Sequence, residues 1–335
     1  MMNYDPFICL KNEHLCAEIL PYGAALRALW VPDRAGKPVD VVLGFDTPEE
    51  YAARDGCFGA TVGPIANRIG GAACLLKGSL LRLTPNDRGN CLHSGDAGLH
   101  RKIWTVAEAS DRAVTLEYVH PDGLGGIPGE IRFEVRYRLE DDGLLVAYRA
   151  LSRRDTLCNL TNHSYFNLDG HDSGPILDHR VRIRAQSFTP TDEASIPTGA
   201  IRAVGGTALD LSRPVRIGER IDAPDGQLQL ARGFDQNFVI DAAGEAFRPA
   251  AELWGARSGI KLTLWTDRPG VQLYTGNYIP AGLRGKDGAV YGPRQGLCLE
   301  TQGFPDAPNH SGFPPILLEA GSVWTSRTLF RFSVE

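Results

Sequence analysis

The sequence lacks the features that mark several specialised classes of protein. No segment approaches about 18 uncharged apolar residues, so we expect no membrane-spanning helix. Residues 1–20 contain no basic region followed by an apolar run, so we expect no signal peptide. Positive charge is not in excess, because 35 Lys and Arg stand against 40 Asp and Glu, a formal net charge of −5. This balance argues against a general polyanion binder, and we expect neither a nucleic-acid nor a membrane partner.

The cysteines also lack a recognisable arrangement. There are seven, an odd number, the gaps between them are irregular, and no C-x-x-C occurs. A disulfide framework or a zinc knuckle is therefore not expected. We expect most of these residues to be buried thiols in a soluble, cytoplasmic protein. They are Cys9, Cys16, Cys57, Cys74, Cys91, Cys158 and Cys298.

What the sequence does contain is typical of a globular protein rich in short strands. Hydrophobic residues make up 43% and charged residues 22%, and the 38 glycines and 22 prolines are spread along the chain. Helical signals are few. Thr47-Pro48-Glu49-Glu50 combines an N-cap, a proline at the first helical position and a capping-box glutamate, and predicts a short helix to about Arg54. No repeat, linker or change in composition marks a boundary, so we predict one large, mostly antiparallel all-β domain over residues 1–335.

Alternating apolar and polar residues predict the individual strands. Residues 131–139, IRFEVRYRL, alternate without a break, which is typical of a half-buried strand. After Asp142-Gly143, the run 144–148 predicts the second arm of a β-hairpin. Similar runs that predict strands cover residues 113–119, 181–183, 260–265, 271–278 and 323–332.

The first stretch that suggests chemistry is Leu157–Leu168, LCNLTNHSYFNL. If it is a strand, one face is mainly apolar and the other carries amide, hydroxyl, imidazole and phenol groups. The second face consists of Asn159, Thr161, His163, Tyr165 and Asn167. A solvated outer face is the alternative, but such faces usually carry Lys, Glu and Arg. The pattern favours a strand that lines a polar cleft.

The second stretch is Gly296–Ala307, GLCLETQGFPDA. Alternation places Glu300 on one side of a predicted strand with Cys298 and Gln302, in an otherwise uncharged segment. An isolated carboxylate there is either paired structurally or held with a raised pKa for proton transfer. The pattern by itself slightly favours the structural role.

Other candidates are weaker when taken singly. Asp235 and Asn237 share one face of Phe234–Phe238, and Gln272 shares a face with Tyr274. Asn67-Arg68 and His93 stand in glycine-containing segments. In most proteins an arginine such as Arg68 would form a surface ion pair, and a histidine such as His93 would be structural.

Taken together, the segments resemble the aldose 1-epimerase (mutarotase) family along nearly the whole chain. Eight segments match in the family's order, a far more specific signal than any one of them. They are FGATVGPIANRI, NCLHSGDAGLHRKIW, HPDGLGGIPGEIRFEVRYRL, NLTNHSYFNLDG, FTPTDEASIPTGAIRAVGGTALDL, FDQNFVI, VQLYTGNYI and LCLETQGFPDAPNHSGFP. The resemblance implies a galactose mutarotase-like β-supersandwich with a sugar cleft and no metal or organic cofactor. It implies an isomerase that interconverts the α and β anomers of free aldoses such as D-galactose and D-glucose. The partner would be a small-molecule monosaccharide, and either a monomer or a homodimer is open.

The resemblance carries over the family's functional residues position by position. The catalytic acid is the histidine of NHSYFNL, His163, and the catalytic base is the glutamate of LETQ, Glu300. The carboxylate would take the proton of the C1 hydroxyl while the imidazolium gives one to the ring oxygen, each contributing about 10²–10⁴-fold. Tyr165, on the predicted face of His163, is a weaker lining candidate. The residues that would orient the sugar are Asn67, Arg68, His93, Asp235 and Gln272.

The chain departs from the usual family pattern at several positions. Pro64 stands where many members have arginine, Ser94 replaces a glycine, and Gln236 stands where members commonly have histidine. The run Gly98-Leu99-His100-Arg101 replaces a GFDK-type segment. None of these changes removes the proposed acid or base. We expect them to act on the rim of the cleft and hence on the preference for one sugar over another.

Two other functions stay open from the sequence. Glu300 and Asp235 could form the carboxylate pair of a hydrolase or lyase acting on a glycosidic bond. A non-catalytic carbohydrate-binding protein could keep the same cleft, although retention of both His163 and Glu300 argues against it. A phosphate-binding loop at residues 123–129 is not expected, because a strand-like segment rather than a helix follows. Metal-ligand spacing is absent from His171, Asp172, Asp178 and His179.

Overall fold

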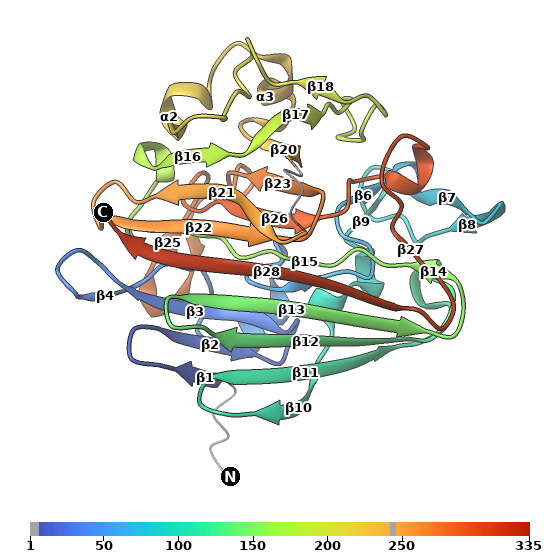
Figure 1. Ribbon diagram of the computed structural model, residues 1–335, viewed down its shortest axis with the longest axis horizontal. Coiled ribbons are helices and arrows are strands. Elements are labelled where there is room, and N and C mark those ends of the chain that lie inside the picture. The colour runs from blue at the N-terminus through green and yellow to red at the C-terminus, as the bar shows by residue number, and fades with distance from the viewer. Residues whose placement is uncertain (1–6, 242–245) are drawn as a thin grey trace.

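The computed structural model describes residues 7–241 and 246–335 (Figure 1). Its largest unit is a nine-stranded antiparallel sheet in the order β10-β11-β12-β13-β28-β22-β21-β16-β19. Figure 1 shows these strands side by side, from β10 at one edge to β16 near the other. Their bounds are β10 Thr105–Ala109, β11 Ala113–His120, β12 Ile131–Leu139, β13 Gly143–Ser152, β16 Arg180–Ile183, β19 Val215–Arg216, β21 Arg248–Trp254, β22 Ile260–Thr266 and β28 Val323–Val334.

Two smaller sheets accompany it. A five-stranded sheet has the order β18-β17-β20-β23-β26, with bounds β17 Ala185–Thr189, β18 Arg202–Ala203, β20 Asp235–Ile240, β23 Gly270–Tyr274 and β26 Cys298–Gln302. A four-stranded sheet consists of β1 Ile8–Lys11, β2 Cys16–Leu20, β3 Ala25–Pro32 and β4 Pro38–Asp40. Short pairs complete the fold: β5 Thr61–Val62 with β15 Thr161–Asn162, β6 Arg68–Ile69 with β9 Cys91–Leu92, β7 Ala73–Leu76 with β8 Ser79–Arg82, β14 Thr156–Leu157 with β27 Leu317–Leu318, and β24 Leu283–Arg284 with β25 Val290–Tyr291.

The nine-stranded and five-stranded sheets share one apolar core. A single buried cluster contains Val135 and Phe330 from the larger sheet together with Phe238, Leu273 and Leu299 from the smaller one. The alternation of β12 explains this arrangement, since its odd-numbered residues are buried along the whole strand. The predicted mostly-β fold of packed antiparallel sheets is therefore confirmed.

Helices are few and short, as the sequence predicted. Within the described ranges the α-helices are α1 Pro48–Ala53, α2 Ile217–Arg220 and α3 Gly226–Ala231. Helix α1 begins with the predicted capping box, because the Thr47 side chain accepts from the Glu50 backbone and the Glu50 side chain accepts from the Thr47 backbone. No helix in the described part of the chain is long and apolar enough to cross a membrane.

The prediction of one strand over Leu157–Leu168 is wrong. Only β14 and β15 form there, and the rest of the stretch is irregular and buried on both sides. The side chains of its asparagines explain the difference, because they bond to distant backbone groups and replace a regular ladder. Asn159 bonds to both backbone groups of Gly303, and Asn162 donates to the carbonyl of Gly59.

The strand predicted over residues 271–278 is too long. It ends at Tyr274, after which the backbone turns at Gly276, whose φ is 62°. The run 144–148 is part of a longer strand, since β13 extends to Ser152. The other strand predictions are confirmed to within two residues at each end.

Candidate active site

The predicted site residues meet at one cavity of about 470 Å³. Seven of the eight line it, namely Asn67, Arg68, His93, His163, Tyr165, Asp235 and Glu300. The eighth, Gln272, is buried outside the lining, and its Nε2 donates to Oδ1 of Asp235 at 2.7 Å. Gln272 therefore supports the wall of the cavity through Asp235.

Strand register in the five-stranded sheet brings the two acidic residues together. Gln272 of β23 lies opposite Glu300 of β26 on one side and opposite Asn237 of β20 on the other. Asp235 is two residues before Asn237, so it projects from the same face of the sheet. Three neighbouring strands thus place both carboxylates on one wall.

A second wall comes from the pairing of β6 with β9. Arg68 lies opposite Leu92, so Asn67 and His93 flank the pair. The backbone N–H of Asn67 donates to Nδ1 of His93 at 3.1 Å, and the N–H of His93 donates to the carbonyl of Asn67 at 3.0 Å. Since Nδ1 accepts a hydrogen bond, the neutral ring of His93 carries its proton on Nε2.

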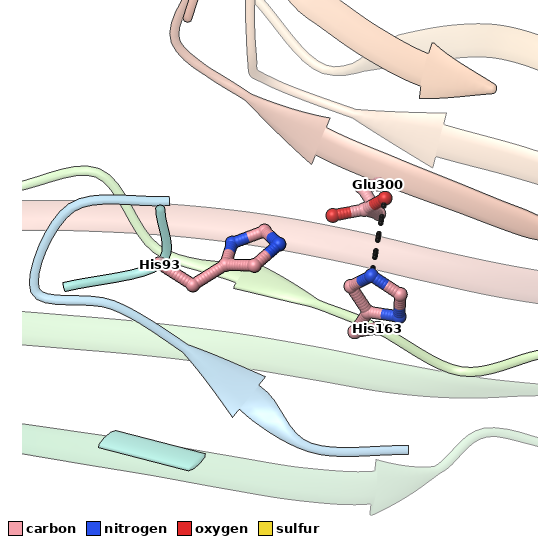
Figure 2. A group of neighbouring side chains, drawn as sticks. All are labelled: His93, His163 and Glu300. Carbon is pink, nitrogen blue, oxygen red and sulfur yellow. Dashed lines mark ion pairs between the residues drawn. The ribbon is translucent and has the colours of Figure 1, made fainter. Parts of the chain in front are cut away.

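His163 follows β15 and faces Glu300 in the lining of the cavity. Its backbone is fixed on both sides, because its N–H donates to Ala60 and its carbonyl accepts from Gly59. Nε2 of His163 lies 3.6 Å from Oε1 of Glu300, and Figure 2 shows this nitrogen pointing toward the carboxylate. An imidazole and a carboxyl group therefore stand side by side in the cavity lining, too far apart for a short hydrogen bond.

Burial sets the protonation of this pair. It raises the pKa of Glu300 well above its usual value, with a further increase from the charge of Asp235 and an opposing effect of Arg68. Burial lowers the pKa of His163 to about 4, and a hydrogen bond with the residue's own backbone partly offsets this decrease. Both shifts favour uncharged groups, namely a carboxylic acid and a neutral imidazole. The pair then holds one proton more than a carboxylate and a neutral imidazole would.

Two further site residues are shifted in the same way. Burial raises the pKa of Asp235, against the effects of Arg68 and of the hydrogen bond from Gln272. Burial lowers the pKa of His93 well below its usual value, and nearby His163, His100 and Arg68 add to the decrease. The cavity therefore presents several groups that titrate far from their usual pH, as functional sites commonly do.

Three of these residues also form a candidate metal-binding group. His93, His163 and Glu300 bring one ligand atom each to within 4.8 Å of one another, the one such group in the residues described (Figure 2). The chemistry of His93 does not fit a metal, because Nδ1 accepts the Asn67 N–H and the neutral ring then has a proton on Nε2. The residues His171 and His179 bond elsewhere, to Tyr291 and to Leu168.

Comparison with known proteins identifies the family of this chain. The sequence pattern described as Aldose 1-epimerase matches residues 6–331. The chain belongs to the aldose 1-epimerase family. This is a family of isomerases that act on small sugars. The chain is 44% identical over 325 residues to galactose mutarotase of Bos taurus, covering 97% of this chain and 93% of that protein. It is 32% identical over 328 residues to aldose 1-epimerase of Escherichia coli (strain K12), covering 97% and 94%.

Solved structures of the family share the fold. The crystal structure of an aldose epimerase homologue from C. elegans superposes with a TM-score of 0.91 at 31% identity, covering 98% of each chain. Galactose 1-epimerase from Lactobacillus acidophilus NCFM superposes with a TM-score of 0.84 at 28% identity, covering 98% of this chain and 94% of that one. The β-supersandwich inferred from the family resemblance is therefore confirmed.

The departures from the family pattern divide into two groups. Pro64, Ser94 and Gln236 do not line the cavity, contrary to the expectation that they shape its rim. Ser94 instead bonds through Oγ to both backbone groups of Ile65, and Gln236 is buried with Nε2 on the carbonyl of Gln227. The second group is the run 98–101, in which His100 and Arg101 do reach the cavity wall.

The sequence left several site residues unassigned. Tyr274 lines the cavity, and its ring centroid lies 6.2 Å from that of His163. Cys298 lies with Sγ 3.4 Å from Nδ1 of His163. Both had a signal, since Tyr274 shares a predicted face with Gln272 and Cys298 shares one with Glu300. Tyr22 reaches the wall from a distant segment and had no comparable signal.

Proposed function

We propose that this protein interconverts the α and β anomers of free aldoses, with His163 and Glu300 as its acid and base. The observation that carries the proposal is the 3.6 Å approach of Nε2 of His163 to Oε1 of Glu300 in the wall of the cavity. Arg68 and Asp235 line the same cavity, where they can bind sugar hydroxyl groups. Membership of the aldose 1-epimerase family supports the reaction type.

The proposed reaction conserves protons within the pair. When the sugar binds, the proton of the pair passes from Glu300 to His163. Glu300 as carboxylate then takes the proton of the C1 hydroxyl, the bond between C1 and the ring oxygen breaks, and His163 as imidazolium protonates that oxygen. The resulting acid and neutral imidazole are the forms that burial favours. Rotation about C1–C2 presents the other face of the aldehyde, and ring closure reverses both transfers. One proton shared by the two groups is enough for a complete turnover.

The proposal extends to the surroundings of the enzyme. We infer that residues 1–335 act as a single domain, which the shared core of the two large sheets supports. A cytoplasmic location suits the seven free thiols, since reducing compartments preserve them. The substrate would be a monosaccharide such as D-galactose or D-glucose, bound to a monomer or a homodimer.

Polarimetry on freshly dissolved α-D-galactose and α-D-glucose tests the function. We expect the wild-type protein to speed the approach to anomeric equilibrium. His163→Ala and Glu300→Ala should each lose about 10²–10⁴-fold of this rate. His14→Ala and Glu319→Ala change exposed residues of the same types and serve as controls. A folded wild-type protein that accelerates neither these sugars nor pentoses would refute the proposal.

A further inference from the structure

One arginine of the cavity wall acts on both candidate carboxyl groups. Arg54, Arg68 and Arg101 line the wall, and Arg54 and Arg101 pair with Glu50 and Asp55 at 3.4 Å and 2.8 Å. Arg68 is the arginine whose charge opposes the burial effect on both candidate carboxyl groups, and it lowers the pKa of Asp235 and of Glu300. The placement of its guanidinium therefore affects the pKa of the proposed base as well as the binding of the sugar.

A carboxylate outside the cavity holds that guanidinium. Nε of Arg68 donates to Oδ2 of Asp87 at 2.7 Å, and the two side chains are 15% and 20% exposed. Asp87 is not a lining residue, although its neighbour Asn86 is. Among the described residues, Arg68 makes no other side-chain hydrogen bond, so its two Nη groups are available to a ligand in the cavity.

Asp87 is itself firmly placed. It exchanges backbone hydrogen bonds with Asn90 at 3.0 Å and 2.8 Å across a two-residue turn. The central residues Arg88 and Gly89 have φ of 51° and 84°, which is the combination of a type I′ turn. The turn fixes the direction of the Asp87 carboxylate relative to β9.

Each carboxylate oxygen of Asp87 accepts a hydrogen bond from one arginine. Nε of Arg88 donates to Oδ1 at 3.1 Å, while Oδ2 receives Arg68. Although burial alone would raise the pKa of Asp87, the hydrogen bonds from Arg68 and Arg88 hold it below the usual range. Arg88 also donates to the carbonyl groups of Glu193 and Ala194 at 3.2 Å and 3.0 Å, in the loop that follows β17. The carboxylate is thus anchored to the rest of the protein.

From this arrangement we propose that Asp87 is a positioning residue for Arg68 in the mutarotase reaction. It binds Nε, so that the Nη groups face the sugar, and its negative charge limits the positive charge that Arg68 exerts on Glu300. The inference rests on the proposed function. A purely structural tie between two loops is the competing explanation, and it predicts no effect on the titration of Glu300.

Three variants separate these explanations. Asp87→Asn keeps the size of the side chain and removes its charge, Asp87→Glu keeps the charge, and Arg88→Ala removes the contact to the other oxygen without touching Arg68. In Asp87→Asn the uncompensated charge of Arg68 stabilises the Glu300 carboxylate. We expect kcat/KM for galactose to fall about tenfold. The alkaline-side apparent pKa of kcat/KM, where the pair loses the proton of Glu300, should fall by on the order of 0.5 pH unit.

The controls should behave differently. Asp87→Glu and Arg88→Ala are expected to keep the alkaline-side limb of the wild type, and Asp87→Glu to recover part of kcat/KM. An unmoved limb in Asp87→Asn, with the same loss of activity as in Arg88→Ala, would overturn the proposal and leave only a structural tie.

A measurement without substrate separates this inference from the proposed function. The carboxyl carbon of Glu300, assigned by its absence in Glu300→Gln, can be titrated by NMR in the ligand-free protein. We expect a lower midpoint in Asp87→Asn, and an unchanged midpoint would overturn the inference. Lack of mutarotation by the wild type would instead refute the proposed function. The titratable or charged groups near Glu300 are His163, Asp235, Arg68, His93, Tyr165, Cys57 and Cys298.

Discussion

The thiol of Cys298 lies 3.4 Å from Nδ1 of His163, the ring nitrogen opposite the one that faces Glu300. Burial and the charge of Glu300 raise the pKa of Cys298 well above its usual value, so the group stays a neutral thiol. A thiol is both a weak donor and a weak acceptor. It can therefore contact Nδ1 in either protonation state of the ring while Nε2 keeps its direction.

Removing this thiol should weaken catalysis more than binding. We expect Cys298→Ala to lower kcat about three- to tenfold with little change in KM, because the ring loses a contact that orients it. Cys298→Ser keeps a donor and acceptor and should retain most of the activity. Polarimetry at several sugar concentrations separates kcat from KM. A kcat within about twofold of wild type in Cys298→Ala would argue against an orienting role.

The losses in rate caused by removing each of the two proposed catalytic groups should not multiply in the double variant. His163 and Glu300 exchange protons with the sugar in the same step. When one of them is removed, the other therefore cannot complete the reaction alone. We expect His163→Ala combined with Glu300→Ala to lie within about tenfold of the slower single variant. Rates that fall by the product of the two single losses would indicate independent roles. Circular dichroism should first show that all three variants are folded.

Acid should destabilise the fold through its buried histidines. Burial lowers the pKa of His100 to about 3 and those of His120, His163 and His179 to about 4. Between pH 6.5 and about 4 the unfolded chain binds more protons than the folded one. The contribution of these neutral histidines to the free energy of unfolding is therefore fully present above pH 6.5. It decreases as the pH is lowered toward 4, by up to about 1.4 kcal/mol per pH unit for each histidine.

Urea unfolding measured at several pH values checks this expectation. His120→Gln should flatten the dependence, since His120 is fully buried, whereas His14→Gln at an exposed position should leave it unchanged. A free energy of unfolding that is constant between pH 7 and pH 4.5 would contradict the shifts.

Removal of divalent metals should leave mutarotation intact. Nδ1 of His93 is occupied by the Asn67 N–H and Nε2 then carries a proton, so His93, His163 and Glu300 do not offer a complete set of free ligand atoms. We expect dialysis against EDTA to keep the rate within about 20% of the untreated enzyme, and added Zn²⁺ to give no activation. A chelator-dependent loss that Zn²⁺ restores would show that the trio binds a metal.

The sequence by itself determined the features that depend on neighbouring residues. Alternation predicted the strands β12 and β13, and the capping box at Thr47 predicted helix α1, because side chains a few residues apart decide these elements. Family motifs predicted six of the residues that line the cavity, and alternation added Tyr165. Local patterns failed over Leu157–Leu168, where asparagine side chains bind backbone groups far away in the chain.

Only the tertiary structure decided how these residues meet. Strand pairing brings Glu300 beside Gln272, and a separate loop brings His163 to within 3.6 Å of Glu300. The contacts of Cys298 with His163 and of Asp87 with Arg68 join residues from different segments. The pKa shifts of the pair arise from burial, which is a property of the packed interior. A local sequence pattern does not show which distant side chains pack together and exclude water.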